Sequence, residues 1–163
     1  MRLNVSSILR RAGSQVGFDF SAEASDFFED GLAPFQPVLI KGVVQNIGED
    51  VLLATGTICT KLAGQCDRCL APAFESVEIA FSERFAKATF ADEGYRFEGD
   101  IINLAQMVRE QLLLSTPAKW LCQTECKGLC PICGTDQNQI QCNCIIKRDN
   151  AFAALARYDV KEE

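Results

Sequence analysis

The chain has 163 residues, 48% of them hydrophobic, which suffices for one domain with a substantial core. Its net charge of −6 and isoelectric point of about 4.8 make it a poor general binder of nucleic acid, because phosphate neutralisation requires clustered lysine and arginine. The absence of histidine removes the commonest general base and the usual ligands of catalytic zinc, so we expect no enzyme.

The N-terminal part of the sequence predicts one helix, one strand and a loop. Residues 3–12 carry apolar side chains at i, i+3, i+4 and i+7 and predict a helix that Gly13 ends. Residues 15–20 alternate between apolar and polar side chains, which is typical of a strand. Residues 21–35 are acidic and irregular, so we expect a loop there.

Three runs in the middle of the sequence predict an antiparallel meander. Residues 38–47 and 51–62 are rich in β-branched and apolar residues, and a connection of hairpin length separates them. Residues 74–85 alternate most cleanly, which indicates a sheet with one face in water. The short connections make the three strands neighbours. Cys59, inside the second run, is expected to be a buried small apolar residue.

An amphipathic helix is predicted over residues 104–115, after a loop over residues 87–99. Asn103 can cap this helix, and Gln106 three residues later completes a capping-box pattern. Apolar residues then recur on one face, and Pro117 stops the helix. We expect the apolar face to lie on the sheet and to complete its core.

The cysteines after this helix predict a metal site. Six of the nine cysteines lie between Cys122 and Cys144. Two cysteines two residues apart can bind one ion from a tight turn, and a following glycine allows the positive φ that points backbone N–H groups at the sulfurs. Four thiolates suit structural zinc. We therefore assign one zinc to the following four residues: Cys130, Cys133, Cys142 and Cys144.

A second arrangement uses eight cysteines and two ions. Cys66 and Cys69 lie in the connection between two predicted strands, and they could join Cys122 and Cys126 in a second site. We favour one ion, with Cys122 and Cys126 free or assisting, and keep two ions as the alternative. An iron–sulfur cluster also takes four thiolates. A redox pair at Cys66 and Cys69 is a further alternative, although such pairs usually open a helix.

The remaining features complete the interpretation. Asp149 or Asn150 can cap a last short helix through residues 152–156. We divide the chain into a core domain, residues 1–118, and a cysteine-rich zinc-binding segment with the C-terminal helix, residues 119–163. The expected fold class is α+β: an antiparallel β-meander packed by an amphipathic helix, followed by a segment resembling a zinc ribbon.

The same patterns bear on the compartment. No run approaches the roughly 18 apolar residues of a membrane span, and the first residues lack the apolar region of a secretion signal. Nine cysteines without an export signal indicate a reducing, cytoplasmic compartment, where thiols bind metal rather than pair. We expect no membrane partner and no small-molecule substrate.

Taken together, the motifs resemble the YceD family, named for large ribosomal RNA subunit accumulation. The residues that carry the resemblance are, in order, Cys66-Asp-Arg-Cys69-Leu, Arg109-Glu-Gln-Leu-Leu-Leu-Ser-Thr-Pro117, Cys122-x₃-Cys126, Cys130-Pro-Ile-Cys133-Gly and Cys142-x-Cys144. The resemblance implies a cytoplasmic bacterial or plastid protein that supports synthesis, processing or stability of large-subunit ribosomal RNA, without established catalysis. The chain departs from the family pattern at Asp136-Gln-Asn138 and at Asp149-Asn-Ala151.

Our interpretation is a non-enzymatic factor that docks a ribosome-assembly protein or a large-subunit precursor particle, with direct RNA contact left open. A zinc or redox sensor that uses Cys66 and Cys69 is the second hypothesis, and accessible thiols of low pKa would distinguish it. A hydrolytic RNA-processing enzyme is the third, with only Asp and Glu as candidate bases.

Overall fold

The computed structural model describes residues 1–23, 36–87 and 94–145. Within these residues, the strands order as β2-β3-β4-β5-β6 in one sheet, and β1 pairs with β7 in a second. The fold is α+β, as predicted. The elements are β1 (Arg2–Asn4), α1 (Ser6–Leu9), β2 (Gln15–Ala22), β3 (Val38–Gly48), β4 (Val51–Gln65), β5 (Pro72–Lys87), β6 (Tyr95–Phe97), β7 (Ile101–Asn103) and α2 (Ala105–Leu114).

The predicted meander is confirmed, because β2, β3, β4 and β5 pair antiparallel with their neighbours along the chain. The turn between β3 and β4 contains Glu49 at φ 53° and Asp50 at φ 58°. Positive φ at both central residues matches the twist of the flanking strands, so this two-residue turn closes the hairpin. The edge strand β6 pairs parallel with β5, which makes the sheet mixed rather than purely antiparallel.

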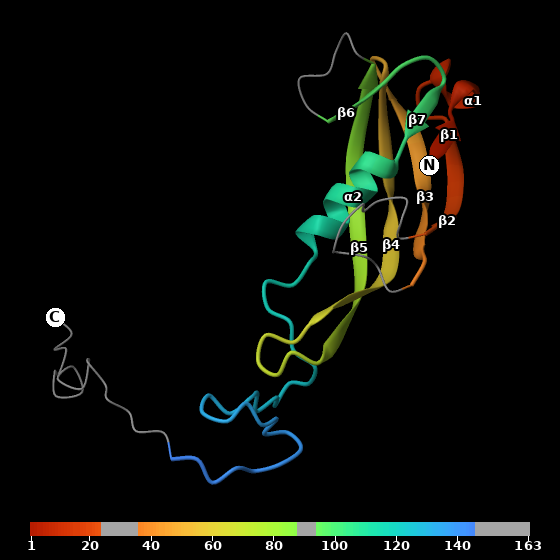
Figure 1. The fold of residues 1–163 in the computed structure, drawn as a ribbon. Helices are drawn as coiled ribbons and strands as arrows, with labels where there is room; N and C mark the ends of the chain where they lie inside the picture. Colours follow the sequence, from red (N-terminus) through yellow and green to blue (C-terminus); the bar gives the residue numbers. More distant parts are fainter. Residues whose placement is uncertain (24–35, 88–93, 146–163) are drawn as a thin grey trace, which may run out of the picture.

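The hairpin of β4 and β5 is longer than the sequence pattern indicated. Pairing continues to Gln65 opposite Pro72, past the predicted ends of both strands. This extension carries the turn with Cys66 and Cys69 beyond the main body of the sheet. The long hairpin therefore brings its turn to the chain segment that follows α2 (Figure 1), where Cys66 and Cys69 meet two of that segment's cysteines.

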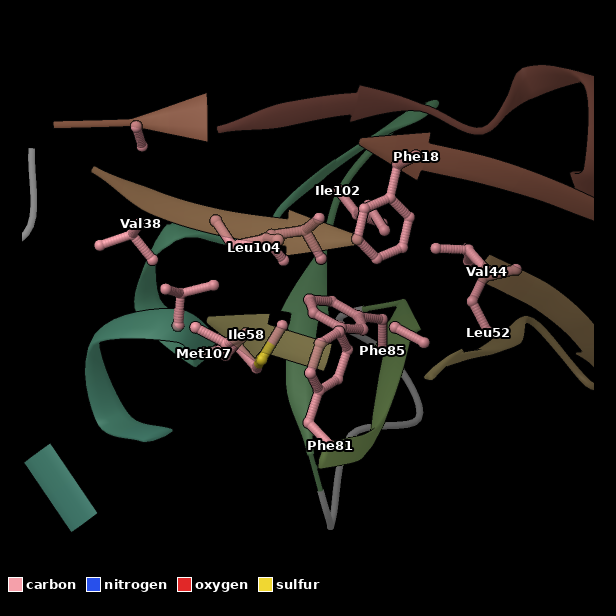
Figure 2. Packing of buried hydrophobic residues seen from close by; sticks show 14 of the residues in the cluster. Phe18, Val38, Val44, Leu52, Ile58, Phe81, Phe85, Ile102, Leu104 and Met107 are labelled. Carbon is pink, nitrogen blue, oxygen red and sulfur yellow. The ribbon is translucent and has the colours of Figure 1, made fainter. Parts of the chain in front are cut away.

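One face of the sheet and the apolar face of α2 form the core, as predicted (Figure 2). Met107 of α2 lies in the same buried cluster as Ile58 of β4 and Phe85 of β5. Ile102 of β7 and Val5, which precedes α1, belong to the same cluster. Burial of a large apolar side chain contributes about 1.5–3 kcal/mol, so the sheet and its helix can be stable through apolar packing alone.

Two predictions about the N-terminal part and the strands were wrong. The helix expected over residues 3–12 is only Ser6–Leu9, because Arg2–Asn4 pairs as a strand with β7. The Asn4 side chain accepts hydrogen bonds from the Ser6 backbone and hydroxyl, which begins the chain reversal. Cys59 is half-buried rather than buried, because Ile58 and Thr60 are the neighbours that point into the core.

The helix α2 begins and ends within one residue of its predicted limits. Asn103 accepts a hydrogen bond from the Ala105 backbone at 3.1 Å, whereas the Gln106 side chain donates to Glu110 instead of completing the capping box. The predicted helix over residues 152–156 lies outside the described residues. The division of the chain at residue 118 stays a prediction.

Candidate metal centres

Eight of the cysteines form two groups of four, and within each group all sulfur atoms lie within 4.8 Å of one another. We name them by position relative to the sheet. The inner group consists of Cys66, Cys69, Cys122 and Cys126. The outer group consists of Cys130, Cys133, Cys142 and Cys144. The segment 119–145, which contributes six of these residues, is called the cysteine ribbon below.

The inner group joins the β4–β5 turn to the ribbon. The Cys66 backbone N–H donates to the Ala71 carbonyl at 2.8 Å, and the Leu70 N–H donates to the Cys66 carbonyl at 2.9 Å. Leu70 adopts φ 62°, a conformation that reverses the chain within a few residues. This tight turn brings the Cys66 and Cys69 side chains to one side, where they meet the two ribbon cysteines.

The outer group is built on a similar turn within the ribbon. Gly134 has φ 72°, which confirms the positive φ predicted after Cys133. Its N–H donates to the Cys130 carbonyl at 2.9 Å, and the Cys130 N–H donates to the Thr135 carbonyl at the same distance. The Cys133 thiol also lies 3.2 Å from the Thr135 hydroxyl. The turn therefore presents both sulfurs to the pair Cys142 and Cys144.

The sulfur geometry fits tetrahedral metal coordination. Four sulfurs about 2.3 Å from a central zinc are separated from one another by about 3.8 Å. The Cys66 and Cys126 sulfurs are 3.8 Å apart, and those of Cys69 and Cys122 are 3.4 Å apart. A disulfide requires about 2.05 Å, and all of these cysteines are free thiols. The donor set of each group therefore suits a thiophilic cation such as zinc.

The pKa shifts of the thiols also favour a bound cation. Burial opposes ionisation of Cys66, but the backbone N–H groups of Cys122, Arg68 and Cys69 outweigh it and lower its pKa to about 6. Hydrogen bonding by the neighbouring Cys69 sulfur raises the pKa of Cys122 to about 12. Four sulfurs held together cannot all ionise without a cation, because each thiolate disfavours the next.

The outer group repeats this division. The Thr135 hydroxyl and backbone lower the pKa of the Cys133 thiol to about 6. Interaction with the Cys133 sulfur raises the pKa of Cys144 to about 12. The backbone N–H groups of Cys133 and Ile132 also lower the pKa of Cys130. In the inner group, the Ala71 backbone N–H favours the Cys69 thiolate, but burial and the neighbouring sulfurs of Cys66 and Cys126 together outweigh it and raise the pKa of Cys69. Each group therefore mixes thiols that ionise readily with thiols that resist ionisation, and a bound cation would remove that conflict.

The model of the family described as "Large ribosomal RNA subunit accumulation protein YceD" matches residues 54–157, which is more than half of the chain and includes both cysteine groups. The chain belongs to the YceD family. The resemblance noted in the sequence is thereby confirmed.

This YceD family member is also similar to curated mycobacterial proteins. Uncharacterised proteins of Mycobacterium bovis and Mycobacterium tuberculosis are each 36% identical over 98 residues, 56% of this chain and 47% of the relative. An uncharacterised protein of Mycobacterium leprae is 30% identical over 107 residues, 61% of this chain and 48% of the relative. The chain thus spans about half the length of the curated relatives it matches. No solved structure matches it.

In this YceD chain, Trp120 and Asp67 fasten the ribbon to the sheet. The Trp120 N–H donates to the Asp67 carboxylate at 2.7 Å, and the Asp67 N–H donates to the Trp120 carbonyl at 3.0 Å. The Trp120 ring covers Gly64 so closely that a Cβ there would lie 2.3 Å from the ring. Arg68 adds a hydrogen bond from its guanidinium to the Cys126 carbonyl at 2.7 Å.

The two groups differ in exposure. Cys66, Cys69 and Cys126 of the inner group are buried, and only Cys122 is exposed. In the outer group, Cys130 alone is buried. The inner group therefore lies between sheet and ribbon, whereas the outer group lies nearer the solvent.

The structure brings together every cysteine that the sequence singled out as a candidate ligand, and it gives both groups the same compact geometry. The sequence analysis favoured one ion over two, but the sulfurs of both groups lie within the same 4.8 Å of one another, so the geometry does not single out the outer group. Sequence reasoning missed Asp67, Trp120 and Asn138, which position the ribbon. A signal existed for Asn138, because it lies in the stretch Asp136-Gln-Asn138 that the sequence analysis compared with the family pattern. Asp67 also lies in a motif of the resemblance, between Cys66 and Cys69, whereas Trp120 carried no such signal.

Proposed function

We propose that the two cysteine groups bind two structural zinc ions, and that the ribbon they hold is a docking surface through which this protein supports accumulation of large-subunit ribosomal RNA. The family description supports the link to this RNA. The observation that carries the zinc assignment is the pair of four-sulfur groups with all sulfurs within 4.8 Å. This extends our sequence-based preference for one ion to two.

Structural rather than catalytic zinc is favoured by the ligands. An all-cysteine set is normally closed, whereas catalytic zinc keeps a position for water or substrate. The chain has no histidine, so the commonest general base is also missing. Each ion, when bound, would supply folding free energy to a segment that buries little apolar surface. We therefore propose a factor without catalytic activity.

A protein partner is favoured over bare RNA by charge and exposure. Lys119 and Lys127 balance Glu125 and Asp136 in the described ribbon, and each four-cysteine zinc centre adds a formal charge of about −2. An RNA backbone would be repelled by that balance. The ribbon also exposes large apolar side chains, which are typical of docking surfaces: Ile132 is 57% exposed, Ile140 64% and Ile145 84%.

We further propose a cytoplasmic location, where ribosomal precursors form in bacteria. No helix among the described residues has the length and apolarity to cross a lipid bilayer. The sensor hypothesis is less well supported, because Cys66 and Cys69 are both buried and a sensor thiol must be reached by its oxidant.

Co-sedimentation tests the docking proposal. Full-length tagged protein should migrate with large-subunit precursor particles on a sucrose gradient at low salt. The substitutions Ile140→Asp and Ile145→Asp should shift it to the free fractions, because a buried unpaired charge opposes docking. Leu114→Asp is the matched control, since Leu114 is 81% exposed but lies at the end of α2 outside the ribbon. Free sedimentation of the wild-type protein would contradict the proposal.

A further inference from the structure

Asn138 contacts the inner group although it belongs to the loop of the outer group. It lies between Cys133 and Cys142, so outer ligands hold both ends of its loop. Its Nδ2 nevertheless donates to the Cys126 sulfur at 3.4 Å. Its Oδ1 accepts from the Lys127 backbone N–H at 2.8 Å and from the Gln123 side chain at 3.1 Å. One side chain of the outer loop therefore engages a sulfur and the adjacent backbone of the inner group.

The side chain of Asn138 is itself held in place. Asp136 accepts hydrogen bonds from the Asn138 backbone at 2.9 Å and from its Nδ2 at 2.7 Å, through the same Oδ1 atom. The Gln137 N–H donates to the Gly128 carbonyl at 2.9 Å, which fixes the loop on the chain between the two groups. The side chain is thus half-buried and preorganised toward Cys126.

We propose that Asn138 couples the two cysteine groups, so that zinc in either group raises the affinity of the other for zinc. This inference rests on the zinc sites of the proposed function. An N–H donor to a ligating sulfur stabilises its negative charge, and outer-shell partners of this kind typically change metal affinity by about 10–100-fold. We expect a coupling factor of about ten.

The coupling runs in both directions. An ion in the outer group holds both ends of the loop and so keeps Asn138 beside the Cys126 sulfur. An ion in the inner group fixes Cys126 and the Lys127 N–H, which then hold the loop for the outer ligands. Thermodynamic linkage requires the two effects to be equal, so one number describes them.

Zinc titrations of the full chain measure that number. Reduced apoprotein is titrated with zinc against a competing chelator, which gives the product of the two association constants. Cys66→Ser/Cys69→Ser leaves only the outer group, and Cys142→Ser/Cys144→Ser leaves only the inner group. The wild-type product divided by the product of the two single-group constants is the coupling factor. The same set is then measured in the Asn138→Ala background.

Two further backgrounds make the test specific. Asn138→Asp keeps an oxygen acceptor for the Lys127 N–H but replaces the Nδ2 donor with a carboxylate oxygen, so it removes the bond to the Cys126 sulfur and adds repulsion toward that sulfur and Asp136. Gln141→Ala is the matched control, since Gln141 is an exposed amide side chain of the same loop. Both Asn138 variants keep the backbone bond between Gln137 and Gly128.

The expected coupling factor is about ten in the wild type and in Gln141→Ala, and about one or less in both Asn138 variants. A factor of one in the wild type would overturn the inference, as would an unchanged factor in the Asn138 variants. If circular dichroism shows that Asn138→Ala does not fold, the coupling factors of Asn138→Asp and of the wild type decide the test. A wild-type protein that binds no zinc would instead overturn the proposed function, so the two failures are distinguishable.

Discussion

The sheet and the cysteine ribbon are ordered by different forces. In the sheet, apolar side chains from five strands and α2 form one continuous buried cluster. Among the described residues of the ribbon, Cys126 and Cys130 are the only buried hydrophobic side chains. The sheet can therefore fold by apolar burial, whereas the ribbon fully buries only sulfur, with Trp120, Leu121 and Leu129 partly buried beside the inner group. The comparison teaches that the cysteines of this protein act as the core of its second region.

The free energy of zinc binding, compared with the stability of a whole domain, makes this difference clearer. Structural zinc contributes on the order of 10–16 kcal/mol to small cysteine-rich peptides. An entire globular domain is stable by only about 5–15 kcal/mol. If the cysteine groups bind zinc as we propose, metal binding should therefore decide whether the ribbon is ordered, and it should matter far less to the sheet. The following predictions test that separation, beginning with the largest effect.

Metal removal should separate the two regions most clearly. With a strong chelator and a reductant, we expect residues 119–145 to lose their protection against amide hydrogen exchange, because the thiols then lack the cation that holds them. The strands β2 to β5 should keep theirs. Hydrogen exchange with mass spectrometry measures both regions in one sample. Equal loss in sheet and ribbon would contradict the separation.

The reverse experiment damages the sheet. Phe85 is fully buried, so Phe85→Ala should lower the free energy of unfolding by about 3–5 kcal/mol. Urea unfolding followed by far-UV circular dichroism reports the change. Phe74→Ala on the same strand is the control, since Phe74 is 43% exposed and its truncation should cost about 1 kcal/mol or less. Zinc content should be unchanged in both proteins, and loss of zinc in Phe85→Ala while the sheet remains folded would count against separate cores.

A substitution at the junction should uncouple the regions without unfolding either. Gly64→Ala places a Cβ 2.3 Å from the Trp120 ring and should displace it, at a cost of about 1–3 kcal/mol. Trp120 is the only tryptophan, so its emission maximum should shift to longer wavelength. Gly17→Ala is the control, because its Cβ meets only the Gly42 carbonyl oxygen at 3.9 Å. Unchanged emission in Gly64→Ala would show that the ring is not held there.

The smallest predicted effect lies in the sheet and depends on pH. The Tyr95 hydroxyl donates to Glu110 at 2.5 Å, and this bond, with one from Gln106, lowers the pKa of Glu110 below its ordinary value of 4.5. A carboxylate with a lowered pKa in the folded state stabilises the fold above the ordinary pKa. That contribution is lost as the pH falls through the lowered value.

Tyr95→Phe removes the main hydrogen bond, so its stability should fall less steeply than that of the wild type as the pH drops below the ordinary glutamate pKa of 4.5. Urea midpoints across this range measure the slope, with Tyr158→Phe as a control for loss of a tyrosine hydroxyl elsewhere in the chain. Parallel pH profiles for wild type and Tyr95→Phe would contradict this assignment. Ribbon order should not differ between these proteins at pH 7.

Sequence patterns predicted the sheet well because local alternation reports directly on which face is buried. The strands β3, β4 and β5 and the helix α2 all follow from such periodicity. The pattern failed for residues 2–4, whose strand conformation depends on pairing with β7 about a hundred residues later. No local signal could show that partner, so helical spacing in residues 3–12 was misleading.

One part of the candidate site could likewise be predicted from local sequence, and the other part could not. The turn at Cys130 and Cys133 could be predicted, because the spacing and Gly134 are local. The joining of Cys66 and Cys69 to Cys122 and Cys126 was only an arithmetic alternative, since it depends on how far the β4–β5 hairpin extends. The hydrogen bonds that fasten the ribbon are long-range and had no pattern to reveal them.

Native mass spectrometry of the purified full chain tests the central claim most directly. Spectra recorded without added reductant, before and after chelation, count the bound ions and identify them by mass. The account predicts two zinc ions per chain before chelation and none afterwards, with no disulfide in either sample. A chain that carries no metal, or whose mass shows the cysteines joined as disulfides, would contradict it.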